Sequence, residues 1–370
     1  MVRFSCEKTL LQQAVNAVSR AVAAKSSIPA LEGILLETEH GLRLSGYNMQ
    51  TGIRTEVEAD IRESGRIVLN AKLFGDMIRR MPDDTVVFDA DEKFNVKLTC
   101  GDTDFEMIGL SANDYPEMPE VDDEYSVTLE QRTLKAMIDQ TSFAVSLNET
   151  RPIHTGVLFE ISDKGLTMVA VDGFRLALRR EPLEHIDGGA FKFVAPGSAL
   201  NEVEKICADT EDMVTVTQGK RHLMFEAGST QLICRRLEGE FLDYRNAIPT
   251  NNPICLEVDN KTMIESLERV SVVISEKLKS PVRCLFSADK VYMSARTGNG
   301  DARDICSVRG DGQELEIGFN NRYLMDALRY APADTVKMHL NTGISPCIIT
   351  PVDDSDSFIY MVLPVRLKAQ

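Results

Sequence analysis

The sequence predicts an α+β fold built from three repeats of one domain, each with two helices packed on antiparallel strands. The first observation is a segment that occurs three times, starting at residues 2, 125 and 254. It consists of a short alternating strand, a helical pattern and a serine in an apolar exit. The serines are Ser19, Ser142 and Ser271. They recur about every 125 residues, and a fixed period is the signature of a repeated structural unit.

A second kind of segment repeats in step with the first, starting at residues 67, 191 and 315. Each copy reads as strand, helix, acidic turn and strand. Polar linkers that contain proline, at 111–124 and 240–253, follow the same period. The sequence therefore predicts domains at 1–124, 125–252 and 253–370.

The predicted helices each have a single apolar face. In the first helix, Leu11, Val15 and Val18 recur at helical spacing, and Phe74 and Ile78 do so in its partner. The segments between the helices, such as "TVVFDA" and "VTVTQG", alternate apolar and polar residues, as half-buried antiparallel strands do. We therefore expect helices that cover one face of antiparallel sheets.

The composition is that of an ordinary globular protein, with 43% hydrophobic and 26% charged residues in a chain of 370. No stretch approaches the roughly 18 apolar residues that a membrane helix needs. The first residues, "MVRFSCEKTL", lack the apolar core of a signal peptide. These features predict a cytoplasmic protein.

Eight cysteines and five histidines are scattered along the chain. They form no CxxC, HxH or HExxH motif, which makes a metal site improbable. We expect reduced, structural cysteines and neither a metal nor a cofactor.

The net charge is −16, which opposes a phosphate-rich partner if it is spread evenly. Basic residues nevertheless gather on the polar faces of the predicted helices, while acidic residues crowd the turns and linkers. The alternative is that these are ordinary solvated faces, because Glu202 and Asp326 lie on the same helices. The candidates for a DNA-facing surface are Lys8, Arg20, Lys72, Arg79, Arg80, Arg132, Lys135 and Lys205.

Three repeats give six helices, and a ring closed from two chains would hold twelve. If these twelve helices line the ring side by side at a spacing of roughly 8–10 Å, their axes lie on a circle about 32–38 Å across. Subtracting one helix diameter of about 10 Å leaves a hole of roughly 22–28 Å. Such a hole would admit a nucleic-acid duplex.

Three motifs carry a resemblance to a known family. "VDGFRLAL" lies in the second repeat, "FLDYRNAIP" ends that repeat, and "YMVLPVRL" lies near the C-terminus. In the first motif, Asp172 and Gly173 favour a tight turn, and Arg175 between two apolar residues suggests the lip of a pocket. Together with the threefold repeat, they resemble the β sliding clamp of bacterial DNA polymerase III over essentially the whole chain. The resemblance implies a head-to-tail homodimeric ring of pseudo-sixfold symmetry that encircles double-stranded DNA without sequence specificity. It also implies a processivity factor that tethers the polymerase and catalyses no reaction itself.

The resemblance further implies one peptide-binding pocket per chain. It would take short linear motifs from the DNA polymerase III α subunit, the clamp loader and repair proteins. An apolar cleft with a few polar anchors suits the leucine and phenylalanine side chains of an extended peptide. The residues matched by position are His154, Asp172, Gly173, Phe174, Arg175, Leu176, Leu242, Asn246, Ala247, Met361, Val362, Leu363, Pro364, Val365 and Arg366.

Three of these positions depart from the family pattern. His154 stands where the family usually has an aliphatic residue, Leu242 where it has proline, and Asn246 where some members have arginine. These departures concern which motif the pocket prefers.

The resemblance adds Lys25 and Asn148 to the DNA-facing residues, whereas Gly197 and Ser198 replace two basic positions of the family. It also places a dimer interface between the segment "CGDTDFEMIGL" and the third domain. We expect arginines to face acidic residues there, around an apolar centre. The interface residues are Asp102, Asp104, Phe105, Met107, Val272, Val273, Arg296 and Arg303.

Two other functions are compatible with parts of the sequence. One is a paralogous clamp with a specialised role, such as resistance to a toxin directed at clamps. The other is a hydrolase that uses Asp172 and His154. The sequence disfavours the hydrolase because it has neither a nucleophile elbow nor an oxyanion glycine motif.

Overall fold

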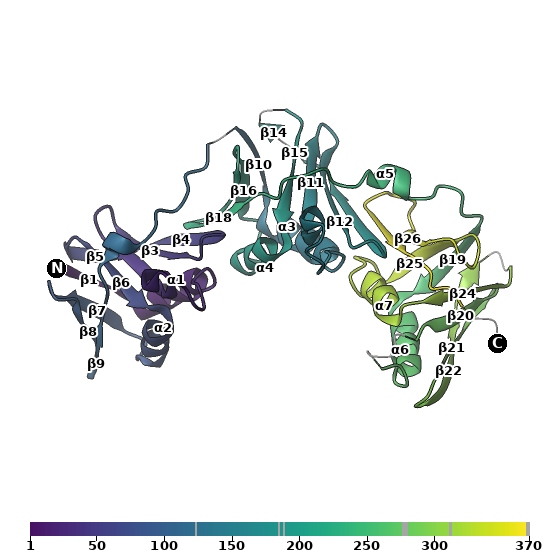
Figure 1. Ribbon diagram of the computed structural model, residues 1–370, viewed down its shortest axis with the longest axis horizontal. Coiled ribbons are helices and arrows are strands. Elements are labelled where there is room, and N and C mark those ends of the chain that lie inside the picture. The colour runs from purple at the N-terminus through teal and green to yellow at the C-terminus, as the bar shows by residue number, and fades with distance from the viewer. Residues whose placement is uncertain (123, 184–185, 188, 276–279, 311–312, 368–370) are drawn as a thin grey trace. The chain divides into compact units, whose positions relative to one another are not determined.

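The computed structural model describes residues 1–122, 124–183, 186–187, 189–275, 280–310 and 313–367 (Figure 1). The chain divides into two compact units. The first comprises residues 1–135, 185–188 and 198–236, and the second comprises 136–184, 189–197 and 237–370. Within the described residues, no helix is both long and apolar enough to cross a membrane.

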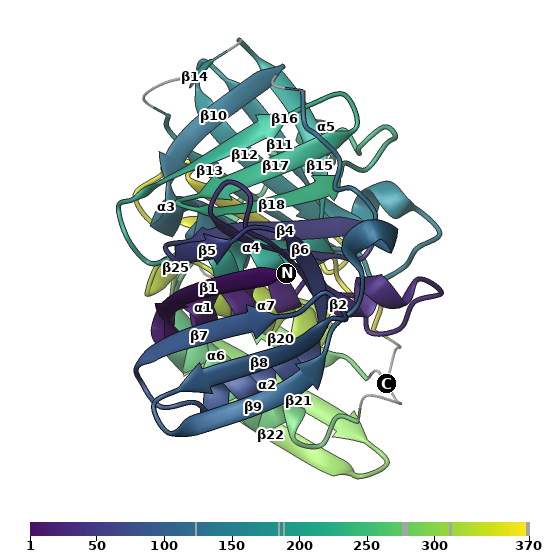
Figure 2. The ribbon, with the colours of Figure 1, turned by 90° about the vertical axis from the view of Figure 1, so that its left-hand side faces the viewer.

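The first unit contains two antiparallel sheets. A five-stranded sheet has the order β5-β1-β7-β8-β9, and Figure 2 shows β7, β8 and β9 side by side. Its strands are β1 (Val2–Glu7), β5 (Asp60–Glu63), β7 (Thr85–Ala90), β8 (Asn95–Cys100) and β9 (Thr103–Ile108). The strand β9 forms one edge of this sheet.

A nine-stranded sheet, with the order β14-β10-β16-β17-β18-β4-β3-β2-β6, runs from the second repeat into the first. The two repeats join where β18 pairs with β4, with Leu232 opposite Ile53. Its strands are β2 (Gly33–Glu37), β3 (Leu42–Tyr47), β4 (Thr51–Val57), β6 (Arg66–Asn70), β10 (Tyr125–Glu130), β14 (Ile186–Asp187), β16 (Met213–Gln218), β17 (His222–Ala227) and β18 (Thr230–Arg235).

Helices α1 (Lys8–Ser19) and α2 (Ala71–Arg80) pack side by side in the first repeat. The expected apolar face of α1 is buried, and Leu11 and Val18 have no exposed surface. Asn70 begins α2, because its side chain accepts a hydrogen bond from the Leu73 amide at 3.0 Å. Two short 3-10 helices, Pro29–Glu32 and Ala112–Asp114, complete this repeat.

The second unit repeats this plan. Its nine-stranded sheet, with the order β15-β11-β12-β13-β27-β26-β25-β19-β23, joins the second and third repeats where β13 pairs with β27. Its strands are β11 (Gly156–Ser162), β12 (Gly165–Val171), β13 (Arg175–Glu181), β15 (Phe191–Pro196), β19 (Ile254–Asp259), β23 (Arg309–Gly310), β25 (Thr335–Leu340), β26 (Cys347–Pro351) and β27 (Phe358–Val362).

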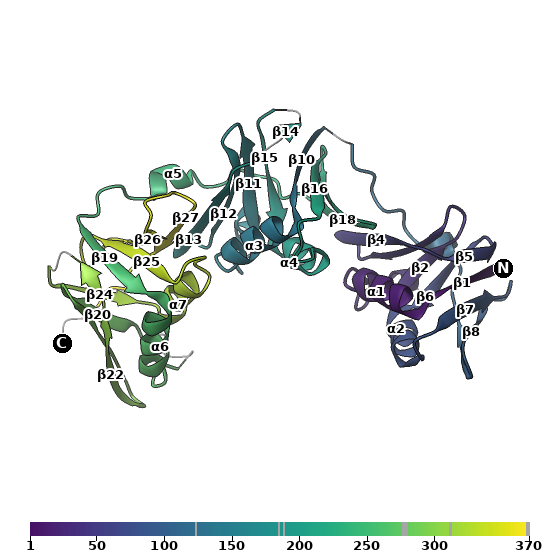
Figure 3. The same cartoon turned by 180° about the vertical axis from the view of Figure 1, so that it is seen from behind.

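A four-stranded sheet, with the order β22-β21-β20-β24, completes the second unit, and β22 is one of its edges. Its strands are β20 (Val282–Phe286), β21 (Lys290–Thr297), β22 (Gly300–Ser307) and β24 (Leu315–Phe319). Figure 3 shows α6 (Asn260–Ser271) and α7 (Asn321–Arg329) side by side in the third repeat, as α1 and α2 are in the first.

The helices of the second repeat, α3 (Gln131–Ser142) and α4 (Gly197–Ile206), cross the boundary between the units. Among the described residues, this repeat also contains two smaller elements, a 3-10 helix (Pro152–Thr155) after α3 and the helix α5 (Tyr244–Ala247) near its end. The predicted α+β fold of three repeats, each with two helices on antiparallel sheets, is confirmed.

Candidate functional site

The motif "VDGFRLAL" forms a tight turn between β12 and β13. One carboxylate oxygen of Asp172 accepts hydrogen bonds from the amides of Phe174 (2.9 Å) and Arg175 (3.0 Å). Gly173 has a φ of 88°, a conformation that glycine adopts at little cost. The local sequence therefore fixes the turn, and the turn fixes where the next side chains begin.

Arg175 is buried in an ion-pair cluster, with only 9% of the residue exposed. Its Nε donates to Asp172 at 2.9 Å, and its Nη1 donates to Asp326 of α7 at 2.6 Å. The guanidinium carbon lies 4.5 Å from the centre of the Tyr323 ring and 5.5 Å from that of Phe143. Because two carboxylates and two rings surround this cation, Arg175 ties the turn to α7 rather than standing free at the lip of a pocket.

Beneath the turn lies an apolar cluster, which we call the floor. Three expected pocket residues are buried in this region, since Leu176 is 1% exposed, Met361 is 8% exposed and Val362 has no exposed surface. They form the support of the site, and a ligand does not reach them in this conformation. The buried members of the floor are Ile153, Leu158, Val169, Val171, Leu176, Leu178, Val194, Tyr244, Ile348 and Met361.

The C-terminal segment runs past the turn and is held at two points. The Leu363 amide donates to the Phe174 carbonyl at 2.8 Å, and the Val365 amide donates to the Gly318 carbonyl at 2.7 Å. Arg366 is exposed. The half-buried residues of this segment are Leu363, Pro364 and Val365.

His154 lies at another border of the floor. Its ring meets the edge of the Phe241 ring, with centroids 5.7 Å apart. Burial, and then the charge of Arg151, lower the pKa of His154. Its neutral form is therefore favoured, and it presents an amphipathic face where the family usually has an aliphatic side chain.

The segment at 242–247 supplies the remaining expected residues. Leu242 is 44% exposed and Ala247 is half-buried. The Asn246 side-chain amide donates to the Asp243 carboxylate at 2.7 Å. Asn246 is therefore already oriented by its own loop.

Helix α5 is fastened to the sheet through one carboxylate. The Tyr244 hydroxyl donates to Glu160 at 2.5 Å, and Nη2 of Arg245 lies 2.6 Å from the same oxygen. Burial, and then this hydrogen bond, raise the pKa of Tyr244. We call this cluster of Tyr244, Arg245 and Glu160 the latch. Leu242, Asn246 and Ala247 flank Tyr244 and Arg245 in the chain, so the latch also fixes the position of these three residues.

Sequence reasoning missed Asp326, Tyr323 and Glu160. The sequence places Asp326 only as an acid on a helix face, and nothing local indicates that it pairs with a residue 151 positions away. Glu160 interrupts an otherwise apolar strand, "GVLFEIS", and a polar residue at such a position was the available signal.

The site combines an apolar floor with exposed apolar side chains at its border. Phe174 is 59% exposed, and its ring stacks 6.1 Å from that of Tyr323. The Asp172 carboxylate is engaged by its own turn and by Arg175, so it is not arranged as a partner for His154. Among the described residues, no three His, Cys, Asp or Glu side chains are grouped to hold a metal ion. The geometry suits recognition of apolar side chains.

The expected interface segment forms the edge strand β9, and its residues differ in exposure. Side chains alternate between the two faces of a strand. Met107 lies on the face of β9 that packs against the core, and it is 6% exposed. Phe105 is half-buried on the same face, while Asp102 and Asp104 are exposed. Ile108, which is 75% exposed, is a further apolar side chain that this edge presents.

The residues expected opposite are exposed in the third repeat. Val272 is 82% exposed, Val273 is half-buried and Arg303 is exposed on the edge strand β22. Arg296 lies 3.5 Å from Asp301 on the neighbouring strand. Of the two arginines, Arg296 has an acidic neighbour, whereas Arg303 has no ion pair among the described residues.

Several of the expected DNA-facing side chains are ion-paired. Lys8 differs most from the expectation, because its side chain is only 13% exposed and lies 2.8 Å from Asp83. Those with a carboxylate partner are Lys8, Arg20, Arg79, Arg132 and Lys205. Within the described residues, those without an ion pair are Lys25, Lys72, Arg80 and Lys135. Asn148 is exposed, and its side chain accepts a hydrogen bond from the Thr150 amide.

Comparison with known proteins identifies relatives over the whole chain. Models of the DNA polymerase III beta subunit match residues 2–119 (N-terminal domain), 128–243 (central domain) and 245–366 (C-terminal domain). The chain is 30% identical to the beta sliding clamp of Halalkalibacterium halodurans, over 99% of this chain and 100% of that relative. The same identity and coverage hold for the beta sliding clamp of Staphylococcus aureus strain Mu50.

Solved structures agree with these relatives. The DNA polymerase sliding clamp from Bacillus subtilis matches with a TM-score of 0.93 and 27% identity, covering 99% of this chain and 100% of that one. The beta subunit from the DNA polymerase of Streptococcus pyogenes matches with a TM-score of 0.93, 29% identity and the same coverage. Three of these four names describe sliding clamps and the fourth describes a DNA polymerase beta subunit, and none of the four mentions a specialised role. With all three domains matched, the chain belongs to the DNA polymerase III beta subunit family, the bacterial β sliding clamps.

Proposed function

We propose that two copies of this chain pair head to tail into a ring that encircles double-stranded DNA. The observation that carries this proposal is the pair of open sheet edges, β9 and β22. Open edges that are not covered tend to pair with another strand. Asp104 and Ile108 are exposed on β9, and Arg303 and Ile305 on β22, so the two edges offer opposite charges and apolar surface to each other.

In this proposal the ring is a processivity factor, and the domains span 1–124, 125–252 and 253–370. It tethers a polymerase by raising its effective concentration at the DNA and performs no catalysis. Cations that have no ion pair within the described part of the chain, such as Lys25, Lys72 and Arg80, make weak phosphate contacts, which carry no sequence information and allow sliding. Because the partner is chromosomal DNA, the protein acts in the cytoplasm.

The ring predicts topological binding, which a comparison of circular and linear DNA tests. The protein is loaded by a clamp loader onto nicked circular DNA, and half of the sample is then linearised. Retention on circles with loss from linear molecules is expected. Equal dissociation from both would refute encirclement.

We also propose that the surface around Phe174 and Leu242 binds short linear motifs. The candidate partners are the DNA polymerase III α subunit, the clamp loader and repair proteins. Exposed apolar side chains above a packed apolar floor can hold the leucine and phenylalanine side chains of an extended peptide. The fixed turn and the latched helix α5 keep this surface preorganised, which lowers the entropic cost of binding.

Substitution at the border of the site tests this assignment. Phe174→Ala and Leu242→Ala should each weaken binding of a fluorescent peptide that contains leucine and phenylalanine by about tenfold, because each removes a large apolar side chain that would contact the peptide. Met213→Ala is the matched control, since Met213 is also about half exposed but belongs to the first unit. If all variants bound the peptide with equal affinity, the peptide would bind at another surface.

A further inference from the structure

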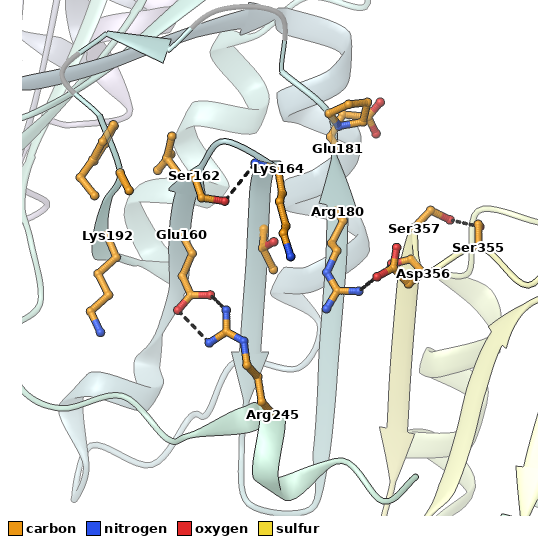
Figure 4. A pocket seen from close by; sticks show the side chains of 15 residues that line it. Glu160, Ser162, Lys164, Arg180, Glu181, Lys192, Arg245, Ser355, Asp356 and Ser357 are labelled. Atoms are coloured by element: carbon orange, nitrogen blue, oxygen red, sulfur yellow. Dashed lines mark hydrogen bonds and ion pairs between the residues drawn. The ribbon is translucent and has the colours of Figure 1, made fainter.

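A polar hollow lies at the opposite end of the strands that carry the peptide site. It has a volume of about 730 Å³, and strands β11, β12, β13 and β15 form its base. Arg245 of α5 and the turn at 355–357 border it (Figure 4). None of the expected site residues lines it.

The hollow begins where the face of the sheet that carries the floor changes from apolar to polar residues. One row of residues across five strands is apolar: Val194, Leu158, Val169, Leu178 and Ile359. Two residues further along each strand, the next row is polar: Lys192, Glu160, Thr167, Arg180 and Ser357. A polar row on five adjacent strands gives this end of the face a surface suited to a charged ligand.

The carboxylates that line the hollow already have partners. Glu160 is held by Tyr244 and Arg245, as described for the latch. Asp356 pairs with Arg180, and Glu181 lies 2.8 Å from Arg179. The acidic side chains of the lining are therefore neutralised by neighbours within the second unit.

Two lysines of the lining have no such partner. Lys164 and Lys192 are exposed, and within the described residues neither amine has a hydrogen bond or an ion pair. Figure 4 shows the Lys164 side chain extending between Glu160 and Arg180. The net charge of the chain is −16, but the two lysines give this hollow a local excess of positive charge. Such an excess would attract a segment that carries carboxylates.

The hollow and the peptide site share their supports. Arg245 borders the hollow, while its neighbours Asn246 and Ala247 belong to the candidate site. Thr167 in the hollow and Asp172 in the turn are five residues apart along β12, which corresponds to roughly 17 Å. A flexible spacer of about eight residues has a mean span of about 16 Å, so one polypeptide can occupy both places.

We propose that the hollow binds an acidic segment of the same partner polypeptide whose apolar motif occupies the site around Phe174. The proposal rests on the peptide-binding function proposed above. A nucleic acid is a less suitable occupant, because its densely spaced phosphates need a longer run of free cations than Lys164 and Lys192 supply among the described residues of the lining. A peptide can place a few carboxylates at the lysines and hydrogen-bond elsewhere to Ser162 and Thr167.

Two designs of fluorescent peptide, each made in two orders of core and tail, test the proposal. Both carry one apolar core with leucine and phenylalanine and a flexible spacer of about eight residues. One ends in four glutamates and the other in four serines, and both orders of core and tail are made. The proteins are the wild type, Lys164→Glu/Lys192→Glu, and the control Lys93→Glu/Lys220→Glu, which changes the net charge equally at exposed lysines of the first unit.

The wild type and the control should bind the glutamate peptide about 3- to 10-fold more tightly than the serine peptide in one of the two orders. The Lys164→Glu/Lys192→Glu variant should lose this preference and keep its affinity for the serine peptide. The preference should also fall as salt is added.

Three results would overturn the proposal. Equal affinity of the wild type for both peptides would show that the hollow takes no acidic segment. An equal loss in the control would make the preference a general charge effect. Competition by a single-stranded oligonucleotide that also requires Lys164 and Lys192 would assign the hollow to nucleic acid. Failure of the serine peptide to bind would instead refute the peptide site itself.

Discussion

Arg175 illustrates how a single residue acquires its role from its surroundings. In the sequence, an arginine between Phe174 and Leu176 suggests the lip of a pocket. In the fold, it is held between Asp172 and Asp326 and covered by two aromatic rings. Breaking the ion pairs of such a buried cation costs stability, because each carboxylate that remains is then poorly solvated and has lost its partner.

Removal of this cation should therefore be strongly destabilising. Arg175→Ala is expected to lower the free energy of unfolding by about 3–5 kcal/mol, because Asp172 and Asp326 then repel each other. Urea unfolding followed by circular dichroism measures the change. Adding Asp326→Asn to Arg175→Ala should recover part of the loss, and an Arg175→Ala variant as stable as the wild type would contradict this role.

His339 predicts a pH dependence of stability. Burial, and then the charge of Lys337, lower its pKa, while its Nε2 lies 2.8 Å from the Thr350 hydroxyl. The unfolded chain therefore takes up a proton at a higher pH than the folded chain does. The contribution of His339 is complete above the ordinary histidine pKa of about 6.5 and is lost as the pH falls below it.

Unfolding by urea at about pH 7.5 and about pH 5.5 brackets this change. The wild type should lose stability between the two, and His339→Gln should lose less, since it carries no titrating group. An identical loss in both proteins would place the effect on other groups.

At the scale of elements, the four residues of α5 owe their position to the sheet beneath them. A helix this short is not stable by itself. Tyr244 packs into the floor, and both Tyr244 and Arg245 reach Glu160. The latch thus links a strand residue to the border of the peptide site.

The two halves of the latch should differ in strength. Tyr244→Phe removes a buried hydrogen bond to a carboxylate and should cost about 1.5–3 kcal/mol. Arg245→Ala removes an ion pair whose arginine is 64% exposed, and should cost about 1 kcal/mol or less. Urea unfolding of both variants gives the comparison, and a larger effect of Arg245→Ala would reverse the assignment.

At the scale of the molecule, the sheets continue across repeats and end at open edges. Where β18 meets β4 and β13 meets β27, the edges of adjacent repeats are already paired within the chain. The edges β9 and β22 have no further strand beside them in the described residues. A second copy of the chain is therefore the partner that we propose for them.

The proposed dimer interface should depend on Phe105 more than on any single charge. Phe105→Ala is expected to weaken dimerisation by about tenfold or more, because aromatic residues near an interface centre dominate its energy, whereas exposed ion pairs contribute about 0–1 kcal/mol. Sedimentation equilibrium measures the dimer constant. Val87→Ala, at a 44% exposed position on β7 of the same sheet, is the control. An unchanged constant for Phe105→Ala would refute this interface.

The sequence by itself determined the three repeats, the two helices of each repeat and the turn at Asp172. These follow from periodicity and from local backbone chemistry, both of which act between residues close in the chain. Leu11 and Val18 are buried as their spacing predicted, and Gly173 adopts the positive φ that the turn requires. Phe105 and Met107 lie on the same face of β9, and only the packing of the fold decided that Met107 is 6% exposed while Phe105 stays half-buried.

Only the tertiary structure decided which of these residues are available for binding. It buried Leu176 and Val362 in or beside the floor, paired Arg175 with a carboxylate from another repeat, and fastened α5 to Glu160. It also left Lys164 and Lys192 unpaired beside neutralised acids, among the described residues. Burial and ion pairing depend on neighbours far away in the chain, so no local pattern specifies them.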